Sequence, residues 1–297
     1  MDLREEWENC LKLLRVEADA GWPRHECIPT GTPGTQGFTP TFDHPIWDGS
    51  EKSITLLVNA DFGMGDTIHF YRFIAAAQQR VKRLILRCDR DLHTLFGSTE
   101  TCSVDDPLPE FDEIIHMMAL PRVLGIGKQD VSGARYLSPN YDEKLAASLY
   151  LFDLMRFTKI GVCWAGNPFS PRDKGRSIPV ELFKSWTDQG MKLFSLSKTD
   201  PAPDGFFDMR DYMQNWNHTA YLLTYMDLVI SVDTAIAHLA GALGAQTALL
   251  VSTKPDWRWK DVGDTTRWYD NVSIFRQKDE GDWVELLARL YGLIQAS

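Results

Sequence analysis

Short apolar runs rich in β-branched residues alternate along the chain with amphipathic or small-residue segments. Apolar runs of about four to eight residues bounded by polar turns are typical of buried strands in parallel sheets. The pattern predicts strands at 53–59, 84–88, 112–117, 160–164, 192–196, 228–232 and 247–251. Helices are predicted from the turn after 59 to about 77, and at 179–186, 217–225, 235–244 and 283–295. Strands that alternate with helices indicate βαβ units and an α/β fold with doubly wound parallel sheets.

The pattern also predicts how the chain is organised. Residues 3–20 carry apolar side chains at helical spacing, and the segment from 21 to 45 is rich in Pro, Gly and Thr, which is typical of a loop or linker. The strand–helix alternation then begins, and it restarts after residue 155. We therefore expect an N-terminal segment (1–45), a first Rossmann-like domain (46–155) and a second one with a C-terminal helix (156–297).

Composition narrows the class of protein. The chain has 297 residues and a formal net charge of −10, which argues against a nucleic-acid partner. Its five cysteines are scattered without a metal-binding spacing, which favours a reducing, cytoplasmic location and no structural zinc. The sequence starts with charged residues rather than a signal-peptide core, and no apolar run is long enough for a membrane span.

The most informative stretch runs from Leu228 to Gly244. An apolar strand passes through Asp233 and Thr234 into a helix of small residues that begins at Ala235. Either Asp233 or Thr234 can cap this helix, and the free N–H groups of its first turn form a site for an anion. Open α/β sheets bind phosphorylated ligands at such positions. The alternative is an ordinary strand–helix unit with a helix cap.

A second turn follows the strand at 53–59. Gly63 and Gly65 allow a tight turn, and Asp66 lies at the expected start of the next helix. The turn lacks the third glycine of the dinucleotide fingerprint and the Gly-Lys-Ser/Thr of a phosphate loop, which disfavours a dehydrogenase or an ATP-dependent enzyme. Asp66 is either an N-cap carboxylate or a general base. His69, one turn later, is expected to be a packed residue.

Two further loops carry candidate chemistry. The loop from Trp164 to Pro179 holds Arg172, Lys174 and Arg176, which could bind phosphate or could be a solvated basic loop. The segment 254–259, with Trp257 and Arg258, could stack on a nucleobase or sugar, or could close the domain as a hydrophobic lid.

Taken in order, these motifs (GMGDTIHFYR, VCWAGNP, RSIP, DLVISVDTAIAHLAGALG, PDWRW, WY, FRQ and GDW) resemble the heptosyltransferase-like, family 9 glycosyltransferases. The resemblance is strongest to the branch that is usually fused to tetratricopeptide repeats, and it covers residues from about 45 to the C-terminus. We see no such repeat array in this sequence.

The resemblance implies a GT-B fold of two facing Rossmann-like domains and an inverting, metal-independent transfer that needs no cofactor. It implies that Asp66 is the catalytic base. It also implies that donor and phosphate groups are bound by Gly65, Asn167, Arg176, Ser177, Asp233, Thr234, Ala235 and His238. Trp257 and Arg258 are candidates for contacts with the base or the sugar of the donor.

Physical chemistry agrees with this assignment. Transfer from a nucleotide-diphospho-sugar leaves negative charge on the diphosphate, which a helix N-terminus and Arg side chains can stabilise without a metal. Because Asp233 carries the same sign of charge as phosphate, we expect it to cap the helix or to meet a sugar hydroxyl.

The expected partners are a nucleotide-sugar donor and a glycan, lipid-linked or protein acceptor. Neither the donor sugar and base nor the oligomeric state follows from the sequence. Two other functions fit the same residues: a silent GT-B module that binds a nucleotide-sugar or a partner, and a sugar-nucleotide epimerase.

Overall fold

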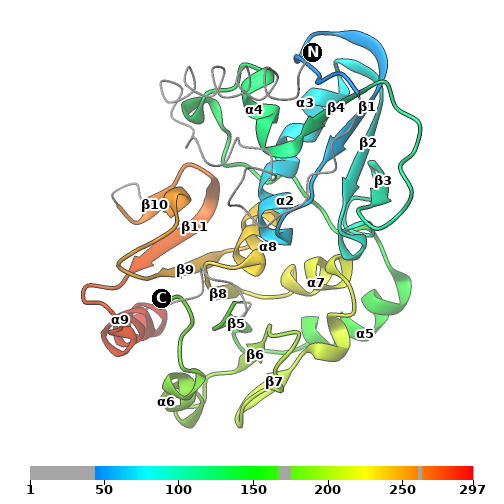
Figure 1. Cartoon of the computed structure of the whole chain (residues 1–297). Coiled ribbons are helices and arrows are strands. Elements are labelled where there is room, and N and C mark those ends of the chain that lie inside the picture. The colour runs from blue at the N-terminus through cyan, green and yellow to red at the C-terminus, as the bar shows by residue number, and fades with distance from the viewer. Residues whose placement is uncertain (1–43, 167–174, 260–262, 297) are drawn as a thin grey trace. The chain divides into compact units, whose positions relative to one another are not determined.

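The computed structural model describes residues 44–166, 175–259 and 263–296, and it divides after Val131 into two compact units (Figure 1). Each unit is built on its own sheet, and every strand pairing is parallel except that of one short edge strand. The expected α/β class with parallel sheets is therefore confirmed. The predicted helix at 3–20 and the Pro/Gly-rich segment lie outside the described residues, apart from its last two positions.

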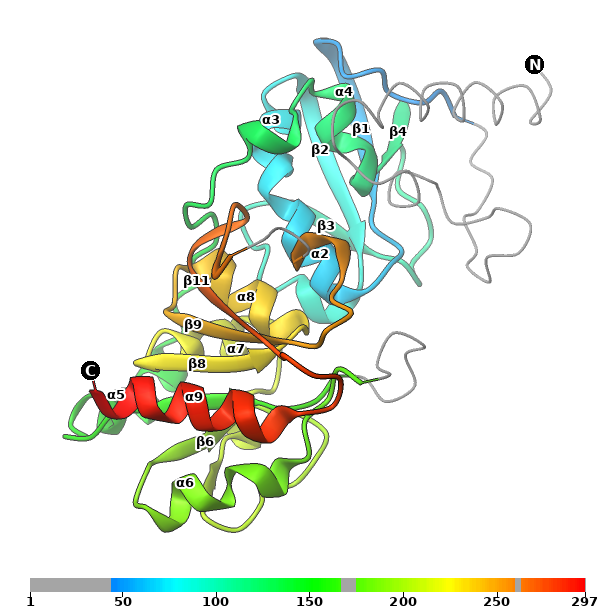
Figure 2. The same ribbon diagram turned by 90° about the vertical axis from the view of Figure 1, so that its left-hand side faces the viewer.

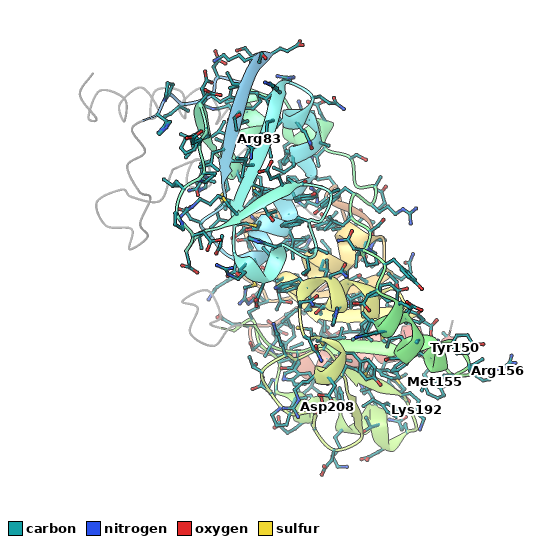
Figure 3. All side chains as sticks on the ribbon, turned by 90° about the vertical axis from the view of Figure 1, so that its right-hand side faces the viewer. Arg83, Tyr150, Met155, Arg156, Lys192 and Asp208 are labelled. Atoms are coloured by element: carbon teal, nitrogen blue, oxygen red, sulfur yellow. The ribbon has the colours of Figure 1, made fainter. Side chains whose placement is uncertain are left out.

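The first unit contains a four-stranded sheet in the order β3–β2–β1–β4. Its strands are β1 (Lys52–Asn59), β2 (Val81–Cys88), β3 (Glu100–Ser103) and β4 (Glu113–His116). Helical segments connect and follow them: α2 (Met64–Phe70), η3 (Tyr71–Phe73), α3 (Ile74–Gln78), η4 (Arg90–Leu92), η5 (Met117–Ala119), α4 (Leu120–Val123) and η6 (Lys128–Asp130). Between β2 and the edge strand β3, Nε of Arg83 donates a hydrogen bond to Glu100 at 2.9 Å. Arg83 is labelled in Figure 3.

The second unit contains a seven-stranded sheet in the order β10–β11–β9–β8–β5–β6–β7. Its strands are β5 (Ile160–Cys163), β6 (Leu193–Ser195), β7 (Phe206–Asp208), β8 (Leu228–Val232), β9 (Thr247–Val251), β10 (Thr265–Thr266) and β11 (Tyr269–Arg276). Its helices are α5 (Glu143–Asp153), η8 (Val180–Phe183), α6 (Lys184–Asp188), η9 (Arg210–Tyr212), α7 (Trp216–Leu223), α8 (Ala235–Leu243), η10 (Trp257–Trp259) and α9 (Trp283–Ala296).

Helices cover both faces of this second sheet, with α7 and α8 on one face and α9 on the other (Figure 2). The face beneath α9 is the core of the unit. There the amphipathic helix α9 packs Trp283, Leu286, Leu287 and Leu290 against Ile230 and other alternating strand residues. The amphipathic C-terminal helix predicted for 283–295 is thus confirmed. Its apolar stripe is buried against the sheet, as amphipathic helices require.

Several elements differ from the sequence expectation. The helix expected up to about residue 77 is divided into α2, η3 and α3, and the one expected at 179–186 is divided into η8 and α6. The strands β3, β7, β10 and β11 and the helix α5 were not predicted. Most of these strands are short, and the alternating, polar pattern of β11 reflects an edge position covered only by the two-residue strand β10.

The units divide earlier than the domain boundary expected near residue 155. The helix α5 lies in the second unit, where it contacts α7, and Asn140 before it donates and accepts hydrogen bonds with the side chain of Asn217 (2.7 and 3.0 Å). These contacts tie the segment from 132 to 155 to the second sheet.

Gly241 of α8 lies against the ring of Tyr269, and a Cβ at this position would be 2.5 Å from two ring carbons. We expect Gly241→Ala to lower the free energy of unfolding by about 1–3 kcal/mol, because the buried ring has no room to move. Gly292→Ala in α9 is the matched control. Nothing lies within 4 Å of its Cβ, so it should raise stability by about 0.5–1 kcal/mol. Urea unfolding of both variants tests this, and equal effects would contradict it.

Candidate functional site

The order in which the chain adds strands to the second sheet reverses between β5 and β8. The chain adds β6 and β7 on one side of β5, and then returns through β8 to add β9 and β11 on the other side. At such a switch point the loops after the two central strands diverge, and open α/β sheets bind ligands there. The loop that follows β5 contains Arg176 and Ser177, and the turn that follows β8 contains Asp233 and Thr234.

The helix α8 begins at this point. Thr234 is its N-cap, with φ −139° and ψ 174°, but its side chain makes no capping bond to the first turn. Its Oγ1 instead lies 3.1 Å from Oγ of Ser231 and 3.6 Å from Sγ of Cys163. Of the two residues expected to cap the helix, Thr234 therefore occupies the position, and neither it nor Asp233 caps the helix through its side chain. The first-turn N–H groups face the switch point.

Asp233 and His238 lie together at the start of α8. Nε2 of His238 is 3.9 Å from Oδ1 of Asp233, and Nδ1 is 2.8 Å from the hydroxyl of Tyr269. The imidazole also stacks on the ring of Trp259, with centroids 5.5 Å apart. The imidazole is thus held in one orientation by residues of β11 and η10.

Burial raises the pKa of the Asp233 carboxyl above its ordinary value. The Trp259 indole, Arg258 and Arg176 act in the opposite direction, while Asp256 adds to the rise. An aspartate with a raised pKa can donate a hydrogen bond as well as accept one, which reduces its repulsion of an anion.

Arg176 and Ser177 are partly buried at the same edge of the sheet. The charge of Arg176 acts on both Asp233 and Cys163, so the guanidinium lies close to the start of α8. Oγ of Ser177 accepts from the N–H of Gly166 at 3.3 Å. The structure therefore brings Arg176, Ser177, Asp233, Thr234, Ala235 and His238 to one site. Asn167, Arg172 and Lys174 lie outside the described residues.

The aromatic segment after β9 forms a packed unit. Trp257 and Arg258 are 7% and 4% exposed, the guanidinium lies 4.6 Å from the centre of the Trp257 ring, and Nη1 is 2.9 Å from Asp256. Trp268 donates from Nε1 to the carbonyl of Arg258 at 2.9 Å. Close packing accounts for these aromatic residues as they stand in the structure, and no ligand contact is needed to explain their burial.

In the first unit, Asp66 lies in the first turn of α2, and the N-cap of this helix is Gly63. Gly65 and Asp66 are both partly buried, and Oδ2 of Asp66 is 3.6 Å from the place a Cβ of Gly63 would take. The carboxylate therefore folds back over the start of its own helix. His69 is fully buried and packs edge-on against Phe70, in agreement with a structural role.

Sequence reasoning missed a polar row at the end of the first sheet, formed by Asn59, Asp61, Arg87 and His116. The signal was present, because Asp61 belongs to the glycine-rich turn and His116 belongs to a predicted strand. Neither residue matched a known motif.

Within the described ranges, no group of three or more His, Cys, Asp or Glu side chains is arranged to hold a metal ion. Among the helices in the same ranges, none combines the length and apolar character that a membrane span requires.

No known family profile matches the chain, and none of the curated proteins is significantly similar to it. Its structure is similar to E. coli ADP-heptose lps heptosyltransferase II (TM-score 0.51, 15% identity, 82% of this chain and 99% of that one). It is also similar to a family 9 glycosyl transferase from Veillonella parvula (0.56, 11%, 84% and 100%). A third similar structure is E. coli heptosyltransferase WaaC with ADP-2-deoxy-2-fluoro heptose (0.50, 12%, 82% and 100%). At these identities the similarity establishes the fold alone, which the chain shares with these glycosyltransferases.

The raised pKa of Asp233 predicts a pH dependence of stability. Because the folded state favours the protonated form, stability falls as the pH rises from about 4 through the folded-state pKa. We expect Asp233→Asn to raise the melting temperature at pH 7 by about 2–4 °C and to have a smaller effect near pH 4. Asp188→Asn, at an exposed pair with Lys184, should change little at either pH. A lower melting temperature for Asp233→Asn at pH 7 would contradict the expectation.

Proposed function

We propose that the chain is a glycosyltransferase that moves a sugar from a nucleotide-diphospho-sugar to an acceptor hydroxyl, with inversion and without a metal ion. The observation that carries this proposal is the site at the start of α8. There an uncapped helix N-terminus, a cation and a buried carboxyl–imidazole pair meet at the switch point of a parallel sheet. The similarity in fold to heptosyltransferases supports the same conclusion.

Each part of this site has a role in the departure of a nucleoside diphosphate. Negative charge develops on the phosphate oxygens as the bond to the anomeric carbon breaks. The first-turn N–H groups of α8 and the guanidinium of Arg176 stabilise that charge, as a metal ion would do elsewhere. Thr234, whose hydroxyl points towards Ser231 and Cys163, positions the turn rather than the phosphate.

Asp233 suits the sugar better than the phosphate. Its burial favours the protonated form, and a neutral carboxyl can donate to one sugar hydroxyl and accept from another. His238, which is fixed by Tyr269, lies with its Nε2 3.9 Å from this carboxyl. We assign the nucleotide-sugar to the second unit and the acceptor to the first.

Asp66 is the proposed general base. In this role its carboxylate removes the proton of the acceptor hydroxyl while that oxygen forms the new bond to the anomeric carbon. The glycine-rich turn supports the role, because Gly63 has no side chain and the Asp66 carboxylate lies over its backbone, 3.6 Å from where a Cβ would be.

Arg176→Ala should weaken the binding of a nucleotide diphosphate about tenfold or more, because it removes a charged hydrogen-bond donor from the phosphate site. Calorimetry of the wild type against ADP, UDP, GDP and CDP, with EDTA and then with Mg²⁺, identifies the ligand. Lys192→Ala, on the loop before β6, is the control and should leave binding unchanged. Absence of binding to all four would favour a silent module, and binding only with Mg²⁺ would contradict the metal-free site.

Asp66→Ala should lower turnover by at least about 100-fold and leave nucleotide affinity nearly unchanged, because a base acts on the acceptor and not on the donor. The exposed Asp91 provides the control: Asp91→Ala should retain activity. Turnover is measured as release of the nucleoside diphosphate with a panel of acceptors. Wild-type turnover in Asp66→Ala would exclude the base assignment, and conversion of the donor without any acceptor would favour an epimerase.

A further inference from the structure

The first sheet has a switch point of its own, between β1 and β4. The chain adds β2 and β3 on one side of β1, and then crosses to add β4 on the other. Asn59, the last residue of β1, pairs in register with Arg87 on β2 and with His116 on β4. Neighbouring residues in register point to the same face of a sheet, so these three side chains form one row at its carboxyl edge.

Hydrogen bonds and charges connect this row into a network. Nη1 of Arg87 donates to Oδ1 of Asn59 at 2.9 Å, and Nη2 donates to the carbonyl of Val104. Asn59 is hydrogen-bonded to Asp61, and Oδ1 of Asp61 lies 3.3 Å from Nε2 of His116. All of these polar side chains are largely buried, and those of Asp61 and His116 are 10% and 7% exposed.

The carboxyl of Asp61 is held in its charged form. Burial opposes ionisation, but the His116 ring and the Asn59 amide more than offset it, and the pKa of Asp61 is lowered. A carboxylate beside Nε2 favours the tautomer of His116 that carries its proton on that nitrogen. In the neutral ring with this tautomer, Nδ1 is the nitrogen that can accept a hydrogen bond.

Both ring nitrogens of His116 are buried, and within the described part of the chain neither has a partner in hydrogen-bond geometry. Nε2 has the carboxylate of Asp61 3.3 Å away. A buried acceptor without a donor destabilises a fold. The ring of Phe62, from the turn that leads to Asp66, lies 5.1 Å away from the imidazole. Asp61 thus orients the ring from the side of Nε2, and no hydrogen bond within the described part of the chain uses Nδ1.

We infer that His116, oriented by Asp61, is a further substrate-binding residue, and that its Nδ1 accepts a hydrogen bond from a hydroxyl of the acceptor sugar. The inference rests on the proposed function, because it assigns the acceptor to the first unit. A hydroxyl fits better than an anion, because the nearest charge is the carboxylate of Asp61. The side chain acts beside the base Asp66 and does not replace it.

Two-bond ¹H–¹⁵N spectra of the full-length, ¹⁵N-labelled protein with bound nucleotide test the inference directly. His116→Asn assigns the ring signals. The probes are methyl α-glucoside, galactoside and mannoside, with tetrahydropyran as a ring of similar size that lacks hydroxyls. We expect an unprotonated Nδ1 whose resonance moves upfield with at least one glycoside and not with tetrahydropyran. A proton on Nδ1, no response to any glycoside, or an equal response to tetrahydropyran would each overturn the inference.

Two variants separate binding from folding. Asp61→Asn should keep the fold but raise the apparent Kd for the responding glycoside at least about tenfold, because the tautomer is no longer fixed. His44→Asn is the matched control. His44 is exposed, and it packs on Phe111 near the first residues of β4, whereas His116 is the last residue of that strand. It should leave the Kd unchanged, and an unchanged Kd in Asp61→Asn would count against the role of Asp61.

Nucleotide binding is measured by calorimetry on the same samples. A glycoside response without nucleotide binding contradicts the proposed donor site and retains His116 as a hydroxyl-binding residue. Nucleotide binding without a glycoside response retains the proposed donor site and contradicts the assignment of His116 as a hydroxyl-binding residue.

Discussion

The close approach of α8 to its sheet is the constraint on which the candidate site depends. Gly241 has no side chain, and this allows the helix to lie directly on the ring of Tyr269. The hydroxyl of the same tyrosine then reaches His238 on the preceding turn. Because His238 is held there, it can face Asp233 and stack on Trp259. One small residue in the middle of a helix thus fixes the orientation of polar groups at its start.

Parallel pairing explains why both units gather polar residues at one edge. In the interior of a parallel sheet covered by helices, side chains must be apolar, and backbone groups are paired within the sheet. Where the strands end, polar side chains can reach solvent, a ligand or one another, so the free-energy cost of burying them is smaller there. In the second unit this edge carries Arg176 and the start of α8, which suit an anion. In the first unit it carries a carboxylate–imidazole pair, which suits a hydroxyl. The two chemistries match the two substrates of a glycosyl transfer.

The similarity in fold and the chemistry of the site contribute different parts of the argument. At 11–15% identity, the glycosyltransferase structures establish how the chain folds. The choice of substrate classes comes from the residues themselves. A helix N-terminus beside a cation selects for phosphate, and an imidazole nitrogen that accepts a hydrogen bond selects for a donor group such as a sugar hydroxyl. The proposed glycosyl transfer requires both ligands, a phosphate group on the donor and a hydroxyl on the acceptor.

Local patterns in the sequence determined the long central elements. β1, β8, β9, α8 and α9 were predicted because each combines a strong period or apolar run with clear end signals, such as the Gly244 that closes α8 with φ 79°. Their common pattern also determined the parallel α/β class. The donor-site residues near Asp233 were accessible for the same reason, since they follow a strand and begin a helix within one continuous motif.

The remaining features were decided by tertiary contacts. The strands β3 and β7 have only four and three residues, and they exist because a longer neighbour offers its backbone groups. The pairing of Asp61 with His116 joins residues 55 positions apart, through the register of β1 and β4. The register of β1 and β4 cannot be predicted from local sequence, because the register results from how apolar residues far apart in the chain pack into one sheet. The sequence therefore specified which polar residues follow each strand, and only the folded sheet decided which of them meet.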